Sequence, residues 1–553
     1  MNKRPLSIVA LLFALCLGSS VALAAELPPE TALDRYINKP DDSYSWEVVS
    51  ETSKGNMKSV VIDMVSQTWR TARDVDRTEW QHWVTLAIPE TIKSDTGFLY
   101  IGGGRNGGKP PKGPSQLVQQ IARATGTVVA ELHMVPNQPL IFHDDGQKRS
   151  EDDLIGYTWD QFLKTGDPTW PARNPMIKSA VRAMDTMTAV MATETGGEQT
   201  VDKFVVAGGS KRGWTTWLTG ALDDRVVAII PIVIDVLNAN VSMRHHFAAY
   251  GFWAPSVGDY VRHRIMQRLD YPRLQELYEL VDPYYYRHRL TKPKFVLNAS
   301  GDQFFLPDSS QFYWDDLQGP KCLRYIPNAD HGMGGSDALM SVIAFYSLIL
   351  ADGQLPEFSW TEEEDGAFRV VVEDAPKQVR LWQATNPAAR DFRVETLGKK
   401  YTSTVLETEE DGVYVANVSP PEEGFTAYFV ELTYDVGAPT PLKLTTSVRV
   451  VPDVLPHADR DPSQPTSITV VCTAPDEDKA RQIIDAAEAF IADKDISTNG
   501  VNTKCNGKTC YLNYRPAGEF EKGGKMLTEW LKSQGGDGFQ YQLESGDRIT
   551  VAE

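Results

Sequence analysis

Short apolar runs alternate with longer amphipathic stretches along residues 80–350. The short runs have few polar interruptions, as expected for strands covered on both faces of a sheet. They lie at 98–101, 127–130, 204–207, 226–234, 295–297 and 323–326. Stretches between them, such as 115–124 and 176–191, repeat apolar residues at helical spacing. This alternation predicts an α/β domain over 25–355, with a mostly parallel sheet wrapped by helices.

One segment interrupts this rhythm. Residues 235–288 are rich in aromatic side chains, arginine and histidine, and their pattern is mainly helical. In this position the segment is expected to form a helical cap, at about 236–290, over the edge where the parallel strands end.

The pattern changes again after residue 355. Short alternating runs at 367–372, 378–382 and 427–432, with turn residues between them, predict a small β-sandwich over 356–451. A stretch rich in proline and aspartate, 452–465, is typical of a linker. The last segment, 466–553, has the order strand, helix, two strands, helix, strand, which predicts a small α+β module of the ferredoxin-like type.

The N-terminus predicts export. Lys3 and Arg4 precede an apolar run at 6–17 that is too short to span a bilayer, and small residues at 22 and 24 follow. This is the pattern of a signal peptide, 1–24, so we expect a periplasmic or secreted protein. No later stretch predicts a membrane helix. The formal net charge of −19 argues against nucleic acid as a partner, because such binding needs clustered Lys and Arg.

Four of the five cysteines follow the predicted signal peptide, and an exported protein can oxidise them. Four cysteines allow three pairings, and the sequence does not choose among them. Cys505 and Cys510 flank a hairpin-turn signal, Asn506-Gly507, and are the candidate local disulfide. Cys322 lies in a predicted strand, where an unpaired buried thiol is equally favoured.

A glycine-flanked serine carries the sharpest chemical signal. In Val205-Val206-Ala207-Gly208-Gly209-Ser210-Lys211-Arg212-Gly213-Trp214, an apolar strand runs into Ser210 and then into a helix. This is the context of a nucleophile elbow, in which small residues allow a tight turn and the N–H of Lys211 faces the developing oxyanion. The usual pattern has glycine two residues after the serine, whereas this chain has Arg212 there.

The other members of a catalytic triad follow in the order that an α/β-hydrolase requires. Asp302 comes directly after the strand at 295–297, and His331 comes after the strand at 323–326. We therefore predict Ser210 as nucleophile, His331 as base and Asp302 as the acid that orients it. Asp235 and Asp308 are alternative acids, and Asp330 is a neighbour of His331 that is badly placed to face its ring.

A glycine-rich loop, 102–108, follows the strand at 98–101 and is expected to supply a second oxyanion donor through Gly103 or Gly104. It lacks the GK[ST] of a phosphate loop. Arg105 and Arg212, with Lys211, are candidates to bind a substrate carboxylate. The alternative for Lys211 and Arg212 is a structural salt bridge to an acidic neighbour such as Asp235. No metal-binding motif is present, and no cofactor is expected.

Several segments together resemble the PhoPQ-activated pathogenicity-related proteins. They are Gly209-Ser210-Lys211-Arg212-Gly213-Trp214, 231–237, 298–307 and Ala329-Asp330-His331-Gly332-Met333, followed by the predicted β-domain. The resemblance covers about 33–451. It implies an exported protein with an α/β-hydrolase core that is tied to virulence or envelope stress.

Two functions are compatible with these features. The first is an exported serine hydrolase that cleaves an ester or amide of a small molecule, peptide or glycan through an acyl-enzyme. The second is a catalytically inactive binding or signalling protein on a hydrolase scaffold, because fold does not fix function. Labelling with a fluorophosphonate distinguishes them.

Overall fold

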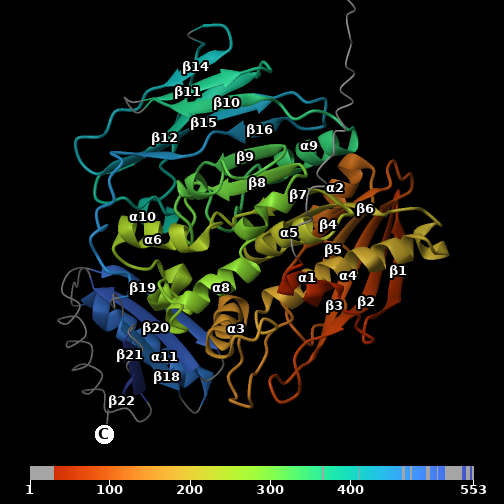
Figure 1. Ribbon diagram of the computed structural model, residues 1–553, viewed down its shortest axis with the longest axis horizontal. Helices are drawn as coiled ribbons and strands as arrows, with labels where there is room; N and C mark the ends of the chain where they lie inside the picture. Colours follow the sequence, from red (N-terminus) through yellow and green to blue (C-terminus); the bar gives the residue numbers. More distant parts are fainter. Residues whose placement is uncertain are drawn as a thin grey trace, which may run out of the picture.

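The fold is that of an α/β-hydrolase with two smaller parts after it, as the computed structural model shows (Figure 1). The structure describes residues 30–363, 367–408, 410–463, 468–473, 476–493, 498–506, 509–516, 539–543 and 548–550. The predicted signal peptide, 1–24, lies outside these residues. No helix within them is long and apolar enough to cross a membrane.

A nine-stranded sheet forms the centre, in the order β1-β2-β3-β5-β4-β6-β7-β8-β9. From β5 onward its strands are parallel, while β1, β2 and β3 pair in antiparallel fashion. The strands are β1 (Ser45–Lys54), β2 (Met57–Thr68), β3 (Glu79–Pro89), β4 (Thr96–Ile101), β5 (Val129–Leu132), β6 (Lys203–Gly209), β7 (Val226–Ile232), β8 (Lys294–Ala299) and β9 (Lys321–Ile326). The six predicted strands are present, and β7 ends two residues before the predicted end at 234.

Helices cover both faces of this sheet. On one face α2 (Gln116–Thr125) packs against α9 (Ala338–Leu350), and on the other α4 (Arg173–Met191) packs against α5 (Lys211–Leu222) and β2. Each face has its own apolar core, and strand residues such as Val205 and Val206 alternate between the two. The parallel strands are thus buried on both faces, as their continuous apolar sequence indicates.

The segment after β7 is helical, and it lies beyond the edge of the sheet where the parallel strands end (Figure 1). It contains α6 (Ala239–Tyr250), η2 (Pro255–Val257), α7 (Gly258–Arg262), η3 (Met266–Arg268), α8 (Pro272–Val281) and η4 (Pro283–Arg289). A further helix, α3 (Glu151–Thr165), contacts α7 and α8. Helix α3, which precedes the nucleophile in the chain, therefore packs against the cap helices.

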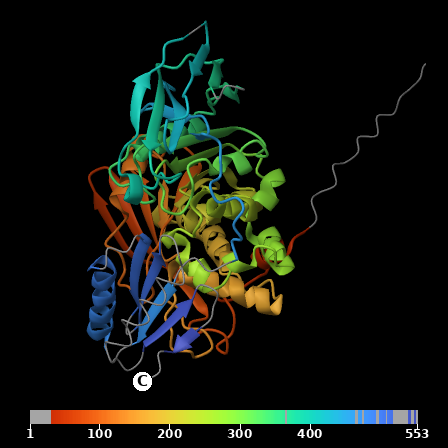
Figure 2. The same ribbon diagram turned by 90° about the vertical axis from the view of Figure 1, so that its left-hand side faces the viewer.

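Two antiparallel sheets follow the hydrolase region, and Figure 2 shows them on the opposite side of it from the C-terminal strands. One contains β10 (Phe358–Glu362), β11 (Phe368–Val372) and β14 (Val413–Ala416). The other contains β12 (Gln378–Asn386), β13 (Thr402–Val405), β15 (Phe425–Tyr434), β16 (Leu442–Thr445) and β17 (Arg449–Val451), with α10 (Val394–Leu397) in a connection. The hydroxyl of Thr445 accepts a hydrogen bond from the Tyr325 N–H, which ties this sheet to β9.

The C-terminal part is an antiparallel sheet in the order β19-β20-β18-β21-β22 with α11 (Glu477–Asp493). Its strands are β18 (Ile468–Thr473), β19 (Thr498–Asn506), β20 (Thr509–Pro516), β21 (Phe539–Leu543) and β22 (Arg548–Thr550). The backbone register sets Cys510 opposite both Cys505 and Cys472. The cysteine side chains and the helix expected at 520–533 lie outside the described residues, so the predicted Cys505–Cys510 disulfide stays a prediction.

Candidate active site

Ser210 occupies a strained turn between β6 and α5. Its φ is 57° and its ψ is −126°, a combination that a non-glycine residue seldom adopts. The Ser210 N–H donates to the Ile232 carbonyl oxygen at 2.8 Å, which attaches the turn to β7. Such strain concentrates at functional sites, where the surrounding structure holds the residue in place.

Two glycines allow α5 to pack closely on the strands. A Cβ at Gly208 would lie 2.7 Å from the Arg212 carbonyl oxygen, and one at Gly213 would lie 2.9 Å from the carbonyl oxygens of Gly208 and Ile232. Both approaches are closer than side chains tolerate. The glycine that this elbow needs after the serine is therefore Gly213, and the position of Arg212 leaves room for a long side chain.

His331 and Asp302 lie together at the carboxyl ends of β9 and β8. An Asp302 carboxylate oxygen is 2.8 Å from Nδ1 of His331, and the same carboxylate accepts the Phe304 N–H at 2.7 Å. The Asp302 side chain is almost fully buried. Nε2 of His331 is also buried and has no hydrogen-bond partner among the described residues. Ser210 and His331 line one cavity together.

The two alternative acids have other partners. Asp235 accepts hydrogen bonds from the hydroxyls of Tyr313 and Tyr325, both at 2.6 Å, and burial raises its pKa to about 8. Asp308 pairs with Arg390 at 2.6 Å and with Nε2 of His245 at 3.0 Å. Of the three aspartates, Asp302 is the one in hydrogen-bond contact with His331.

Lys211 and Arg212, the two cations that follow Ser210, form ion pairs with carboxylates in the first turn of α3. Arg212 binds both carboxylate oxygens of Glu151 at 2.8 and 2.9 Å and donates from Nε to the Val135 carbonyl oxygen. Lys211 lies 2.8 Å from Glu151 and 3.2 Å from Asp152. A structural salt bridge is therefore present, with Glu151 and Asp152 in place of the suggested Asp235. The guanidinium of Arg212 is directed at Glu151. The substrate contact expected of Arg212 stays a prediction.

The glycine loop lies beside Arg212. A Cβ at Gly103 would come within 2.8 Å of the guanidinium, and Gly104, with a φ of 139°, is packed against Met134. The Gly103 carbonyl oxygen accepts the Met134 N–H at 2.8 Å. Neither glycine lines the two cavities found at Ser210 in the described part of the chain, and Arg105 is exposed. Their predicted roles as oxyanion donors and substrate ligand remain predictions.

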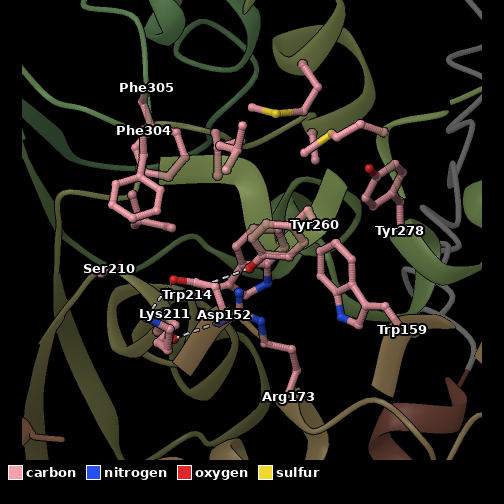
Figure 3. A pocket seen from close by; sticks show the side chains of 16 residues that line it. Asp152, Trp159, Arg173, Ser210, Lys211, Trp214, Tyr260, Tyr278, Phe304 and Phe305 are labelled. Atoms are coloured by element: carbon pink, nitrogen blue, oxygen red, sulfur yellow. Dashed lines mark hydrogen bonds and ion pairs between the residues drawn. The ribbon is translucent and has the colours of Figure 1, made fainter. Parts of the chain in front are cut away.

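An aromatic cavity opens beside Ser210 under the cap, and Figure 3 shows Trp159 and Tyr278 across it from the serine. Its walls include Trp214, Tyr260, Phe304 and Phe305, and two methionines, Met243 and Met266. Three charged residues, Asp152, Arg173 and Lys211, line it as well.

The sequence analysis missed Glu151, Asp152, Trp159 and Arg173. The available signal was the acidic run Glu151-Asp152-Asp153 ahead of apolar residues at helical spacing, which is typical of a helix start.

No group of three or more His, Cys, Asp or Glu side chains in the described ranges is arranged to hold a metal ion.

Comparisons with known proteins identify relatives. The family model of the PhoPQ-activated pathogenicity-related proteins matches residues 33–393. The autocrine proliferation repressor protein A of Dictyostelium discoideum is 38% identical over 455 residues, which cover 77% of this chain and 91% of that protein.

Solved structures with a similar fold include two esterases. An acetyl xylan esterase from Paenibacillus sp. R4 aligns over 59% of this chain and 96% of its own, with 16% identity and a TM-score of 0.41. A glucuronoyl esterase from Solibacter usitatus aligns over 56% of this chain and 86% of its own, with 13% identity and a TM-score of 0.32. At these values the likeness gives no information on activity or substrate.

Proposed function

We propose that this chain, which belongs to the PhoPQ-activated pathogenicity-related protein family, is a serine hydrolase that cleaves an ester or amide through Ser210, His331 and Asp302. The observation that supports this most directly is the contact of 2.8 Å between Asp302 and Nδ1 of His331, with Ser210 in a strained turn on the same cavity. Asp302 keeps the proton on Nδ1, so Nε2 is the nitrogen that can accept one.

The reaction has two steps. Oγ of Ser210 attacks the substrate carbonyl carbon while its proton passes to Nε2 of His331, and the leaving alcohol or amine departs with that proton. Water then attacks the acyl-enzyme and gives one proton to His331, which returns it to Ser210 as the acid product leaves. In this proposal the N–H of Lys211, the first residue of α5, donates to the oxyanion in both steps.

Fluorophosphonate labelling tests the proposal. Intact-mass measurement of the wild-type protein should show one adduct, which Ser210→Ala abolishes. Ser309→Ala is a matched control, because Ser309 is a buried serine in the same domain whose hydroxyl donates to the Leu306 carbonyl oxygen. Labelling that persists in Ser210→Ala, or is absent in wild type, would count against the triad.

An inactive binding or signalling protein is the second candidate. Nε2 of His331 has no partner in the described part of the chain, and the Dictyostelium relative is named as a proliferation repressor. Absence of an adduct in folded wild-type protein would favour this candidate.

The predicted signal peptide supports export of the protein, and the substrate is then a small molecule, peptide or glycan outside the cytoplasm. N-terminal sequencing of the mature protein should begin at Ala25. Recovery of the uncleaved chain in the cytoplasmic fraction would contradict export.

A further inference from the structure

A buried arginine lies on the wall of the aromatic cavity. Arg173, in the first turn of α4, is 2% exposed. Its Nη1 donates to the carbonyl oxygen of Lys211 at 2.9 Å, so the guanidinium lies next to the residue that follows the nucleophile. The guanidinium also lies 4.4 Å from the centroid of the Trp214 ring. Among the described residues, Nε of Arg173 has no hydrogen-bond partner and no carboxylate is within 4.0 Å of the guanidinium.

The charges around Arg173 do not balance. Three cations, Arg173, Lys211 and Arg212, are gathered around two carboxylates, Glu151 and Asp152. Lys211 contacts both carboxylates, and Arg212 takes both oxygens of Glu151. The carboxylates are thus already paired, and the cluster keeps one excess positive charge. Burial is the main cause of the lowered pKa of Arg173, and Tyr260 and the charge of Asp152 offset it only in part. A buried charge whose counter-ion is shared with Lys211 is unfavourable.

The same cavity holds a second unsatisfied donor. Nε1 of Trp159 is buried and lacks a partner in the part of the chain that the structure describes. By contrast, the indole of Trp214 donates to the Val281 carbonyl oxygen. The two unmatched groups, Trp159 Nε1 and Arg173 Nε, are both donors, and a ligand that satisfies them must supply acceptor oxygens. Figure 3 shows their side chains on the opposite side of the cavity from Phe304.

We propose that this cavity binds a carboxylate carried by the substrate, with Arg173 as the main partner of that carboxylate. The aromatic walls then contact the flat apolar part of the same substrate. The inference rests on the proposed hydrolase function and names the substrate class of that site: esters or amides of small aromatic or apolar compounds that bear a second, free carboxylate. Ser210 and Lys211, at the N-terminal end of α5, line the cavity, and the positive end of a helix favours the same charge. Arg173 thus takes the role that the sequence suggested for Arg105 and Arg212.

Matched pairs of esters test this assignment. Phenyl acetate and 4-carboxyphenyl acetate differ by a carboxylate on the leaving group, whereas methyl benzoate and monomethyl terephthalate differ by one on the acyl group. In Arg173→Met, kcat/KM for the charged member of the preferred pair should fall about 10–100-fold through KM, as expected for loss of a charge-assisted contact. The neutral member should change less than about threefold, and Arg173→Lys should restore part of the preference.

Arg225→Met is the matched control, because Arg225 pairs with Asp185 and Asp223 away from the cavity. It should leave both members of each pair unchanged. An equal loss for charged and neutral esters in Arg173→Met would assign Arg173 to support of the elbow and overturn the anion site. A selective loss in Arg105→Met instead would move the site to the glycine loop.

A binding measurement separates this inference from the proposed function. In Ser210→Ala, benzoate should quench the tryptophan fluorescence that Trp159 and Trp214 contribute, benzamide should do so at least tenfold more weakly, and Arg173→Met should abolish the difference. If wild type takes no fluorophosphonate but benzoate still binds through Arg173, the hydrolase proposal fails and the anion site stands. If Ser210 is labelled but benzoate and benzamide bind alike, the anion site fails alone.

Discussion

The change Glu151→Gln removes the carboxylate on which the cations after the nucleophile depend. Glu151 contacts Lys211 at 2.8 Å and Arg212 at 2.8 and 2.9 Å, and the two cationic side chains are 6% and 12% exposed. Glutamine keeps the size and one acceptor oxygen but places an amide against a guanidinium. The variant should therefore lose stability and hold the elbow less firmly.

The expected magnitude lies between two limits. Removal of one partner of a buried ion pair costs about 3–5 kcal/mol, whereas an exposed pair contributes about 0.2–1 kcal/mol. The Glu151 side chain is 40% exposed, which weakens its attraction to the two buried cations. We expect a loss of about 2 kcal/mol, which corresponds to a thermal midpoint lower by roughly 3 °C for a domain of this size.

The effect should also depend on pH. Burial raises the pKa of Glu151, but Lys211 and Arg212 together outweigh it and lower the pKa below its ordinary value. The stabilisation by Glu151 is thus present above its unfolded pKa of about 4.3 and is lost as the pH falls through the folded value. The difference between wild type and Glu151→Gln should be largest near pH 7 and smaller below about pH 4.

Differential scanning fluorimetry at pH 7 and pH 3 measures both effects. Glu51→Gln is the matched control, because Glu51 pairs with Lys58 at 2.7 Å on the surface, where both side chains are about one third exposed. That variant should shift the midpoint by no more than about 2 °C. Equal midpoints for the two variants at pH 7 would refute the reasoning from Glu151.

Three further predictions concern the triad, the nucleophile elbow and the buried carboxyl of Asp235. Asp302→Asn should lower kcat for p-nitrophenyl acetate about 10⁴-fold through the wrong imidazole tautomer, while Asp308→Asn should retain most of the turnover, and the reverse result would reassign the acid. Gly213→Ala places a Cβ 2.9 Å from two carbonyl oxygens and should cost about 1–3 kcal/mol and slow fluorophosphonate labelling, whereas Gly258→Ala, whose Cβ meets open space, should do neither. Burial raises the pKa of Asp235 to about 8, so the folded state holds a proton that the unfolded state releases near pH 4, and stability should fall as pH rises from about 4 to about 8. Asp235→Asn should flatten that slope between pH 5 and pH 8, and a parallel slope would show that Asp235 is not its source.

The parallel strands were predictable because their signal is local. The runs at β6 and β7 are almost purely apolar, and a strand buried on both faces leaves that pattern in the sequence. The antiparallel strands β1, β2 and β3 were not predicted. Most residues of β1 are exposed, whereas β2 and β3 are largely buried and mix polar with apolar residues. Helix α3 was also missed, although its buried residues have helical spacing and its first turn is acidic.

The reacting residues were easier to predict than their surroundings. Ser210, Asp302 and His331 each follow a strand, so chain order was enough to select them as candidates. The partners of Lys211 and Arg212 were not predictable in this way, because Glu151 lies 61 residues before Arg212 and acquires its role through packing of α3 on the elbow. Asp235 is nearer to Lys211 and Arg212 in sequence than Glu151 is, but its carboxylate accepts hydrogen bonds from two tyrosines instead.

The position of Arg212 is best understood from the two helices that meet there. Both α3 and α5 begin at this point, and the positive end of a helix favours acidic residues and disfavours basic ones by about 0.3–1 kcal/mol each. Glu151 and Asp152 interact favourably with the positive end of the α3 dipole, and they also form ion pairs with Lys211 and Arg212 on α5. Because Gly213 meets the steric demand of the elbow, the position before it is free to carry a side chain that fastens α3 to the nucleophile turn. Through α3 the same contacts hold Asp152 and Trp159 in the cavity wall, so the departure at Arg212 helps to build the cavity beside Ser210.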